Sequence, residues 1–205
     1  MSPANRSDAF IGADMCVDDT NGYDGKVPAF TWKIIKKQEA IMPWVDAGPA
    51  RIVQNQAGEW ETTTSIKPVV YGYQKEGWQG APWAPTNMVW VKRQAYVIEA
   101  EPKDPYYNYG TQYMWVDTET SSCGYKVIND RSGKYWKTLL TPDWVAESDD
   151  KKTRFKLPGM NTVMIDDRTD HSTVANTASP NNKYVFLADL DPQDFTLAGF
   201  QKYCK

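Results

Sequence analysis

The sequence is poor in the residues that most often bind metals or carry out catalysis. It has one histidine, His171, and three cysteines, Cys16, Cys123 and Cys204, without a Cys-x-x-Cys spacing. A structural zinc site needs about four such ligands at close spacing, so neither a metal nor another cofactor is expected. The cysteines leave two alternatives open, which are one disulfide with one remaining thiol, or three buried free thiols.

Sequence motifs of nucleotide-binding enzymes and hydrolases are also missing. There is no Gly-x-Gly-x-x-Gly, no P-loop and no Gly-x-Ser-x-Gly. Asp170, His171 and Ser172 are adjacent, but neighbouring residues of a strand point to opposite faces and cannot form a relay among themselves. The sequence therefore predicts a binding protein and not an enzyme.

Long runs of basic or apolar residues do not occur either. The net charge is -3, whereas nucleic-acid binding requires a concentrated basic surface. No stretch approaches the roughly 18 apolar residues of a membrane span, and residues 1–15 show no apolar core of a signal peptide. We expect a protein that is peripheral to a membrane at most.

Aromatic residues, in contrast, are abundant. The nine Trp and twelve Tyr, together with thirteen Gly and thirteen Pro and little Leu, favour a mainly β fold. A chain of 205 residues is suited to a single domain, 1–205. Residues 1–24 are polar and contain Asp14, Asp18 and Asp19, which predicts a solvated loop region.

The clearest β pattern runs from Val89 to Val127. A β-branched and aromatic stretch, 89–100, is followed by a tip rich in turn residues and a second strand, 109–117. Asp117 to Thr120 then forms a turn, and a third strand starts at Cys123. We predict an antiparallel meander here as the centre of the fold.

Other segments show weaker patterns. Strands are predicted at 30–35, 40–42, 51–53, 60–66, 135–140, 161–165, 171–174 and 184–187, a loop or one short helix at 142–152, and a C-terminal helix that begins at Asp191. Pro43 is expected to end the strand before it. The aromatic residues of 71–87 either cap the edge of the core or form a platform or lid for a ligand.

A candidate ligand surface lies on the first hairpin of the meander. If its register places both strands' aromatic residues on one face, an apolar surface forms from Trp90, Tyr96, Ile98, Tyr113 and Trp115. An acyl chain on such a surface would gain about 0.8 kcal/mol per buried CH2 group.

Several motifs in their order resemble a family of Gram-negative exported proteins of unknown function, often labelled outer-membrane lipoprotein-sorting protein and grouped with the LolA/LolB superfamily. The motifs are Phe10–Asp14 with Gly22–Lys26, Phe30–Ile35, the strand Val91–Ala100, the strand Tyr113–Thr120 that ends in Asp-x-x-Thr, Asp170–Val174 and Phe195–Leu197. Family members are about twice as long, and this chain resembles their C-terminal half.

This resemblance implies a strongly curved antiparallel sheet, an incomplete LolA/LolB-like barrel with a short C-terminal helix. It implies a location in the periplasm or cell envelope of a Gram-negative bacterium, although a signal peptide is not visible in this chain. The concave face would receive an acyl chain or another apolar ligand, and an exporter or second protein could complete the barrel. The alternatives are a structural or interaction module that pairs with another exported protein, or a glycan-binding β-domain that uses Trp78, Trp83, Tyr106 and Tyr107.

Overall fold

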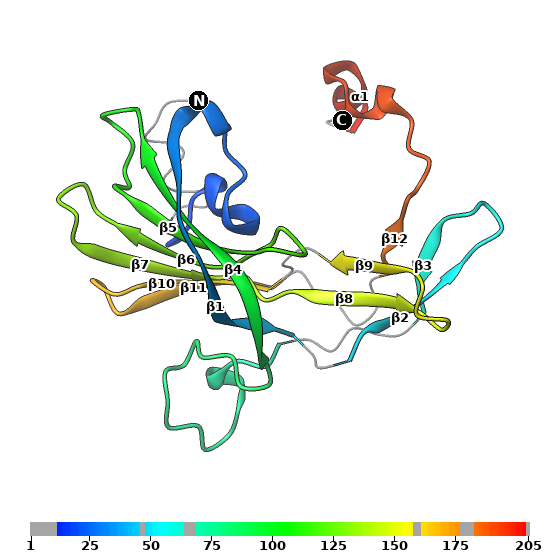
Figure 1. Cartoon of the computed structure of the whole chain (residues 1–205), viewed down its shortest axis with the longest axis horizontal. Coiled ribbons are helices and arrows are strands. Elements are labelled where there is room, and N and C mark those ends of the chain that lie inside the picture. The colour runs from blue at the N-terminus through cyan, green and yellow to red at the C-terminus, as the bar shows by residue number, and fades with distance from the viewer. Residues whose placement is uncertain (1–11, 46–47, 64–68, 158–160, 177–182, 204–205) are drawn as a thin grey trace.

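The chain forms two β-sheets (Figure 1) in the computed structural model, which describes residues 12–45, 48–63, 69–157, 161–176 and 183–203. The strands are β1 (Phe30–Trp44), β2 (Ala50–Gln54), β3 (Trp60–Thr62), β4 (Val89–Pro102), β5 (Gln112–Asp117), β6 (Cys123–Asn129), β7 (Tyr135–Leu140), β8 (Trp144–Ser148), β9 (Arg154–Leu157), β10 (Asn161–Asp166), β11 (His171–Asn176) and β12 (Val185–Phe186). The predicted mainly β fold is confirmed.

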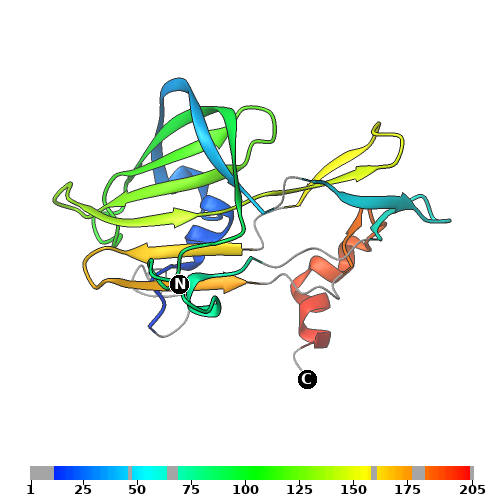
Figure 2. The ribbon, with the colours of Figure 1, turned by 90° about the horizontal axis from the view of Figure 1, so that it is seen from below.

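The large sheet has seven strands in the order β1-β4-β5-β6-β7-β10-β11, and every neighbouring pair is antiparallel. It curls into half of a barrel (Figures 1 and 2), which confirms the predicted strongly curved antiparallel sheet. The small sheet has the order β12-β3-β2-β8-β9 and contains one parallel pair, β2 with β8. This second sheet was not expected from the sequence.

β1 is one strand of 15 residues, although the sequence predicted two separate pieces that end before Pro43. Pro43 pairs with Trp90 of β4, and β1 lies at the edge of the large sheet. Because proline lacks an N–H group, it is tolerated on an edge strand, where one side has no neighbour. A bulge between Ile34 and Lys36 adds local twist to this long ladder.

β4, β5 and β6 form the predicted meander. Trp115 of β5 stacks on Tyr125 of β6, with 4.7 Å between the ring centroids. The turn after β5 is held by Asp117, whose Oδ1 accepts hydrogen bonds from the N–H groups of Glu119 at 2.8 Å and Thr120 at 3.0 Å. The Asp-x-x-Thr sequence is therefore a turn closed by its own first side chain, as the sequence indicated.

The stretch 142–152, predicted as a loop or a short helix, contains β8 instead. Trp144 and Ala146 are 6% and 0% exposed, and they alternate with the more exposed Val145 and Glu147. This alternation of buried and exposed residues is short and is flanked by acidic residues. The local pattern is therefore weak, and packing against the other strands decides that the segment is a strand.

The predicted C-terminal helix is present. Asp191 accepts a hydrogen bond from the N–H of Gln193 at 2.9 Å and so caps a 3-10 turn, η5 (Pro192–Phe195), which precedes α1 (Leu197–Tyr203). Phe200 of α1 is exposed. Among the described helices, none combines the length and the apolar character that crossing a membrane would require.

Residues 12–29 lie inside the curl of the large sheet and fill its concave face (Figures 1 and 2). They include two short 3-10 helices, η2 (Val17–Gly22) and η3 (Val27–Ala29). Met15 and Cys16 are 8% and 2% exposed. They belong to one hydrophobic cluster with residues from six strands of the sheet, which are Phe30, Ala100, Met114, Ile128, Leu139 and Met164.

Acidic groups of this N-terminal segment, residues 12–29, are buried with it. Asp19 is 1% exposed and accepts hydrogen bonds from Lys126 Nζ at 2.6 Å and from the Tyr109 hydroxyl at 2.9 Å. Lys126 itself is 0% exposed. The prediction of a solvated loop is therefore wrong for Asp14, Asp18 and Asp19, which are buried, because the partners of these carboxylates come from segments far away in the sequence.

Two of the three cysteines are buried free thiols, Cys16 and Cys123. The pKa of each thiol is raised to about 12, mainly by burial. Both thiols are therefore protonated and unreactive at neutral pH. Cys204 lies outside the described residues.

The buried ion pair leads to a stability prediction. Asp19→Asn leaves the Lys126 ammonium group buried without a negative partner, and we expect the free energy of unfolding to fall by roughly 3–5 kcal/mol. Urea unfolding followed by tryptophan fluorescence measures this loss. The same change at the exposed Asp24 is the matched control and should stay within about 0.5 kcal/mol of the parent. A loss below about 1 kcal/mol for Asp19→Asn would show that the pair does not anchor the segment.

Candidate functional site: a pocket between the two sheets

The structure separates the five residues that were predicted to line one apolar surface. These are Trp90, Tyr96, Ile98, Tyr113 and Trp115. The register pairs Ile98 with Met114, and Met114 belongs to the core inside the curl, whereas Trp115 pairs with Val97. Because directly opposite residues share a face, the β4 members lie on the concave side and the β5 members on the convex side.

The prediction of one continuous surface is therefore wrong. The register of a hairpin depends on its turn and on packing, and a slip of one residue moves a whole set of side chains to the other face. On the concave side, Trp90 and Tyr96 are 52% and 37% exposed. Trp115 packs instead with Trp44 and Tyr125 around a small buried cluster on the convex side.

The aromatic residues of 71–87 mainly cap the core. Tyr71 is 1% exposed, and Trp83 packs against the same hydrophobic cluster. Trp78 donates its indole N–H to the carbonyl of Ala81 within the loop at 2.9 Å. In the set proposed for glycan binding, Tyr107 is 4% exposed, so these residues do not form one open platform.

A pocket of about 550 Å³ lies where the convex side of the large sheet meets the small sheet. Its lining residues come from the end of β1, from β4, from the turn after β5, and from β8 and β9. They are Trp44, Gly48, Pro49, Arg93, Glu119, Thr120, Val145, Glu147, Arg154, Phe155 and Lys156. We call this the intersheet pocket.

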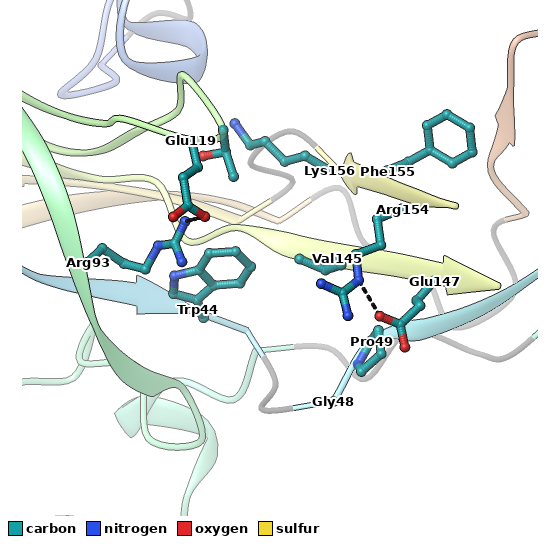
Figure 3. A pocket seen from close by; sticks show the side chains of 11 residues that line it. Trp44, Gly48, Pro49, Arg93, Glu119, Val145, Glu147, Arg154, Phe155 and Lys156 are labelled. Carbon is teal, nitrogen blue, oxygen red and sulfur yellow. Dashed lines mark hydrogen bonds and ion pairs between the residues drawn. The ribbon is translucent and has the colours of Figure 1, made fainter. Parts of the chain in front are cut away.

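Charged groups are concentrated at two ends of the intersheet pocket. Figure 3 shows Arg93 and Glu119 at one end and the ion pair of Arg154 with Glu147 at the other, with Val145 between them. Uncharged side chains therefore separate two polar ends, an arrangement that fits a ligand with both apolar and polar parts.

Arg93 is the most firmly held of these groups. Its Nε and Nη2 donate to the two carboxylate oxygens of Asp117 at 2.6 and 3.1 Å, and Nη2 also donates to Glu119 at 2.8 Å. The guanidinium carbon lies 5.8 Å from the ring centroid of Trp44. This bidentate, stacked geometry fixes the direction of the guanidinium group.

The protonation of Asp117 follows from this contact. Burial by itself would raise the pKa of the Asp117 carboxyl, but the hydrogen bonds from Arg93 and from the N–H groups of Thr120 and Glu119 hold the pKa below its ordinary value. Asp117 is therefore charged at neutral pH, and the Arg93–Asp117 pair is an ion pair.

A lysine from β9 extends toward the end of the pocket that holds Arg93 and Glu119 (Figure 3). Lys156 Nζ lies 3.2 Å from Asp143, which is 4% exposed. Burial of Asp143 raises the pKa of its carboxyl, and the charge of Lys156 acts in the opposite direction. Among the described residues, no group of three or more His, Cys, Asp and Glu could hold a metal ion.

His171 does not line the intersheet pocket and instead contacts the N-terminal segment. Its Nδ1 lies 2.7 Å from Asp14 Oδ2, and the Thr173 hydroxyl donates to the same oxygen at 2.9 Å. Lys137 Nζ donates to the Asp14 carbonyl at 2.5 Å. These bonds fasten the N-terminal segment to β7 and β11.

Most lining residues of the intersheet pocket could not be found from the sequence. Val145, Glu147 and Phe155 lie in or next to the stretch that was predicted as a loop or short helix. Arg93 and Asp117 do lie in strands that were recognised as motifs, but without the fold nothing indicated that these strands border a pocket. The one available sign of a site was a charged residue, Arg93, within a strand pattern that is otherwise rich in β-branched and aromatic residues.

The Arg93–Asp117 pair predicts a pH dependence of stability. The pKa of Asp117 in the folded chain lies below the value of about 3.9 of an unfolded chain. Its contribution is therefore fully present above about pH 4 and is lost as the pH falls through the folded pKa. Asp117→Asn should be less stable than the parent at pH 7, and the difference should shrink between about pH 5 and pH 2.

Urea unfolding across this pH range measures the difference for Asp117. The same change at the exposed Asp167 is the control and should stay within about 0.5 kcal/mol of the parent at pH 7. A deficit of Asp117→Asn that is equally large at low pH would contradict the prediction.

Comparisons with known proteins agree with this architecture. A structure described as a proposed outer membrane lipoprotein-sorting protein domain from Vibrio parahaemolyticus is 16% identical, with a TM-score of 0.51, over 95% of this chain and 57% of that chain. A DUF1329 family protein from Desulfovibrio piger is 11% identical, with a TM-score of 0.48, over 96% and 57%. A LolA superfamily protein from Nitrosomonas europaea is 13% identical, with a TM-score of 0.34, over 88% and 94%.

At these identities the first structure supports the fold alone, and the chain spans 57% of its length. No curated protein matches the chain significantly. The profile of one family, described as Protein of unknown function (DUF1329), matches residues 2–201, and the chain therefore belongs to this family.

Proposed function

We propose that this chain is a binding protein of the bacterial cell envelope that holds an apolar or amphipathic ligand, such as the acyl chain of a lipid or lipoprotein. The observation that carries the proposal is the intersheet pocket. Its volume of about 550 Å³ lies in the usual range of small-molecule sites. Trp44 and Val145 supply apolar surface against which a hydrocarbon chain can be buried.

The ligand binds on the convex side in this proposal, and not inside the curl. The N-terminal segment already fills the concave face and is anchored by the buried pair of Asp19 and Lys126. Removing one partner of such a pair is strongly unfavourable, so a ligand gains little from displacing the segment. The intersheet pocket requires no such displacement.

A periplasmic or envelope location is part of the proposal. The resemblance to exported proteins and the description of the Vibrio parahaemolyticus structure as a lipoprotein-sorting domain support it. A membrane exporter that delivers or receives the ligand would be a suitable partner.

The proposal does not include catalysis. The one histidine pairs with Asp14, and the neighbouring Thr173 hydroxyl donates to the same carboxylate. A nucleophile activated by His171 would instead have to contact the histidine's other nitrogen. In the intersheet pocket, Glu147 forms an ion pair with Arg154, and Glu119 forms one with Arg93.

A charge placed in the apolar wall of the intersheet pocket tests the location of the site. Val145→Asp puts a hydrated carboxylate where the hydrocarbon chain would lie, and we expect at least about tenfold weaker binding, since the chain can be buried there only if that charged group gives up its water. Titration with a fluorescent long-chain fatty alcohol, which has no charge of its own, measures the affinity, and circular dichroism checks the fold.

The matched control is Trp90→Asp, which introduces the same charge at an exposed position of the concave side. It should bind the alcohol as the parent does. If Trp90→Asp weakens binding and Val145→Asp does not, the ligand lies on the concave side and the assignment to the intersheet pocket is wrong. If neither the parent nor any variant binds the alcohol, and mass spectrometry of purified protein finds no acyl species, the proposed function fails.

An interaction module is the second candidate function, and the free edge of β1 favours it. In the described sheets no strand pairs with the outer side of this strand of 15 residues, which is bonded only near its end, where Trp44 forms a bridge with Asp143. Ile34 and Ile41 are 62% and 52% exposed along it. A second exported protein could add a strand here and extend the half-barrel. A stable complex with such a protein, in the absence of extractable lipid, would favour this candidate.

A further inference from the structure

The environment of Arg93 indicates what kind of ligand the intersheet pocket selects. Its guanidinium group is held from one side by Asp117, whose side chain is 2% exposed. Asp117 also accepts hydrogen bonds from two N–H groups of the turn that follows it, so it cannot move away from Arg93 without opening that turn. The arginine is therefore fixed in place before any ligand arrives, which lowers the entropy lost on binding.

The other side of Arg93 faces the intersheet pocket. The side chain is 22% exposed and stacks on Trp44. Nη1 has no hydrogen-bond acceptor among the described residues, and Nη2 reaches Glu119, whose side chain is 76% exposed. An exposed glutamate is held weakly, since such pairs are worth about 0–1 kcal/mol. A ligand anion can replace it without loss of a charge-assisted bond.

The remaining charges of the pocket point to the same ligand chemistry. Three cations line it, Arg93, Arg154 and Lys156, against two carboxylates, Glu119 and Glu147. Figure 3 shows the Lys156 side chain extending toward Glu119, at the same end as Arg93. At that end, Arg93 and Lys156 each have a buried carboxylate partner, Asp117 and Asp143, and Glu119 is the exposed carboxylate that a ligand anion can replace.

We propose that the ligand is an amphiphile with an anionic head group, a carboxylate or a phosphate, which binds Arg93 in place of Glu119 while its hydrocarbon tail lies along Trp44 and Val145. This inference rests on the proposed function and adds the chemistry of the head group. The guanidinium group of Arg93 is a planar, two-pronged donor that matches both carboxylate and phosphate oxygens.

The inference is tested with three ligands that share a sixteen-carbon tail: palmitic acid, hexadecyl phosphate and hexadecanol. Each displaces the fluorescent fatty alcohol from the folded parent chain at submicellar concentration. We expect at least one of the two anions to bind about tenfold or more tightly than hexadecanol, the effect of about one charge-assisted hydrogen bond. The stronger anion identifies the head group, and its advantage should decrease with added salt.

The decisive variant is Glu119→Gln. It leaves the Arg93–Asp117 pair intact, whereas replacing Arg93 would leave Asp117 buried without a partner and endanger the fold. Without the competing carboxylate, the preferred anion should bind about two- to fivefold more tightly, as expected for an exposed ion pair, and the affinity for hexadecanol should not change. Glu39→Gln is the matched control, because Glu39 forms an exposed pair with Lys92 outside the intersheet pocket.

The outcomes separate this inference from the proposed function. Equal affinities for all three ligands, or a Glu119→Gln variant that binds the anion no better than Glu39→Gln, would overturn the anionic head group and leave the acyl-binding function in place. Failure of all three ligands to displace the probe, or of the probe to bind, would overturn both.

Discussion

The structure depends on one buried ion pair, Asp19 with Lys126, which lies inside the curl of the large sheet. Such a pair is stable only when both groups are fully hydrogen-bonded, because each has lost its hydration. Tyr109 supplies a further bond to the same carboxylate. This requirement fixes residues 12–29 on the concave face, and it fills the space that an open half-barrel would present to a ligand.

Because the N-terminal segment fills the concave face, the ligand site that we propose lies on the other side of the sheet. There the strands β1 and β4 end near the small sheet, and the pocket between the sheets receives residues from both. The Arg93–Asp117 pair has two roles in this arrangement. Asp117 closes the turn after β5 and at the same time orients Arg93 toward the pocket. A contact that stabilises the fold thus prepares a group for binding.

Much of the fold could be predicted from local patterns. The meander, the Asp117 turn and the start of the C-terminal helix at Asp191 each follow from residues that are close in sequence. The candidate site could not be predicted in this way. Its walls come from β8 and β9, whose few apolar residues stand between acidic ones, and from a register that moved Trp115 away from Ile98. Both depend on packing between segments that are far apart in the chain.

The sequence alone determined that this protein is mainly β and that its central strands are antiparallel neighbours. Composition and period decide these properties, because they act over a few residues. Only the tertiary structure decided which face of each strand is buried and that the acidic N-terminal segment belongs to the core. The reason is that a carboxylate is equally compatible with water or with a buried lysine, and long-range contacts select between the two.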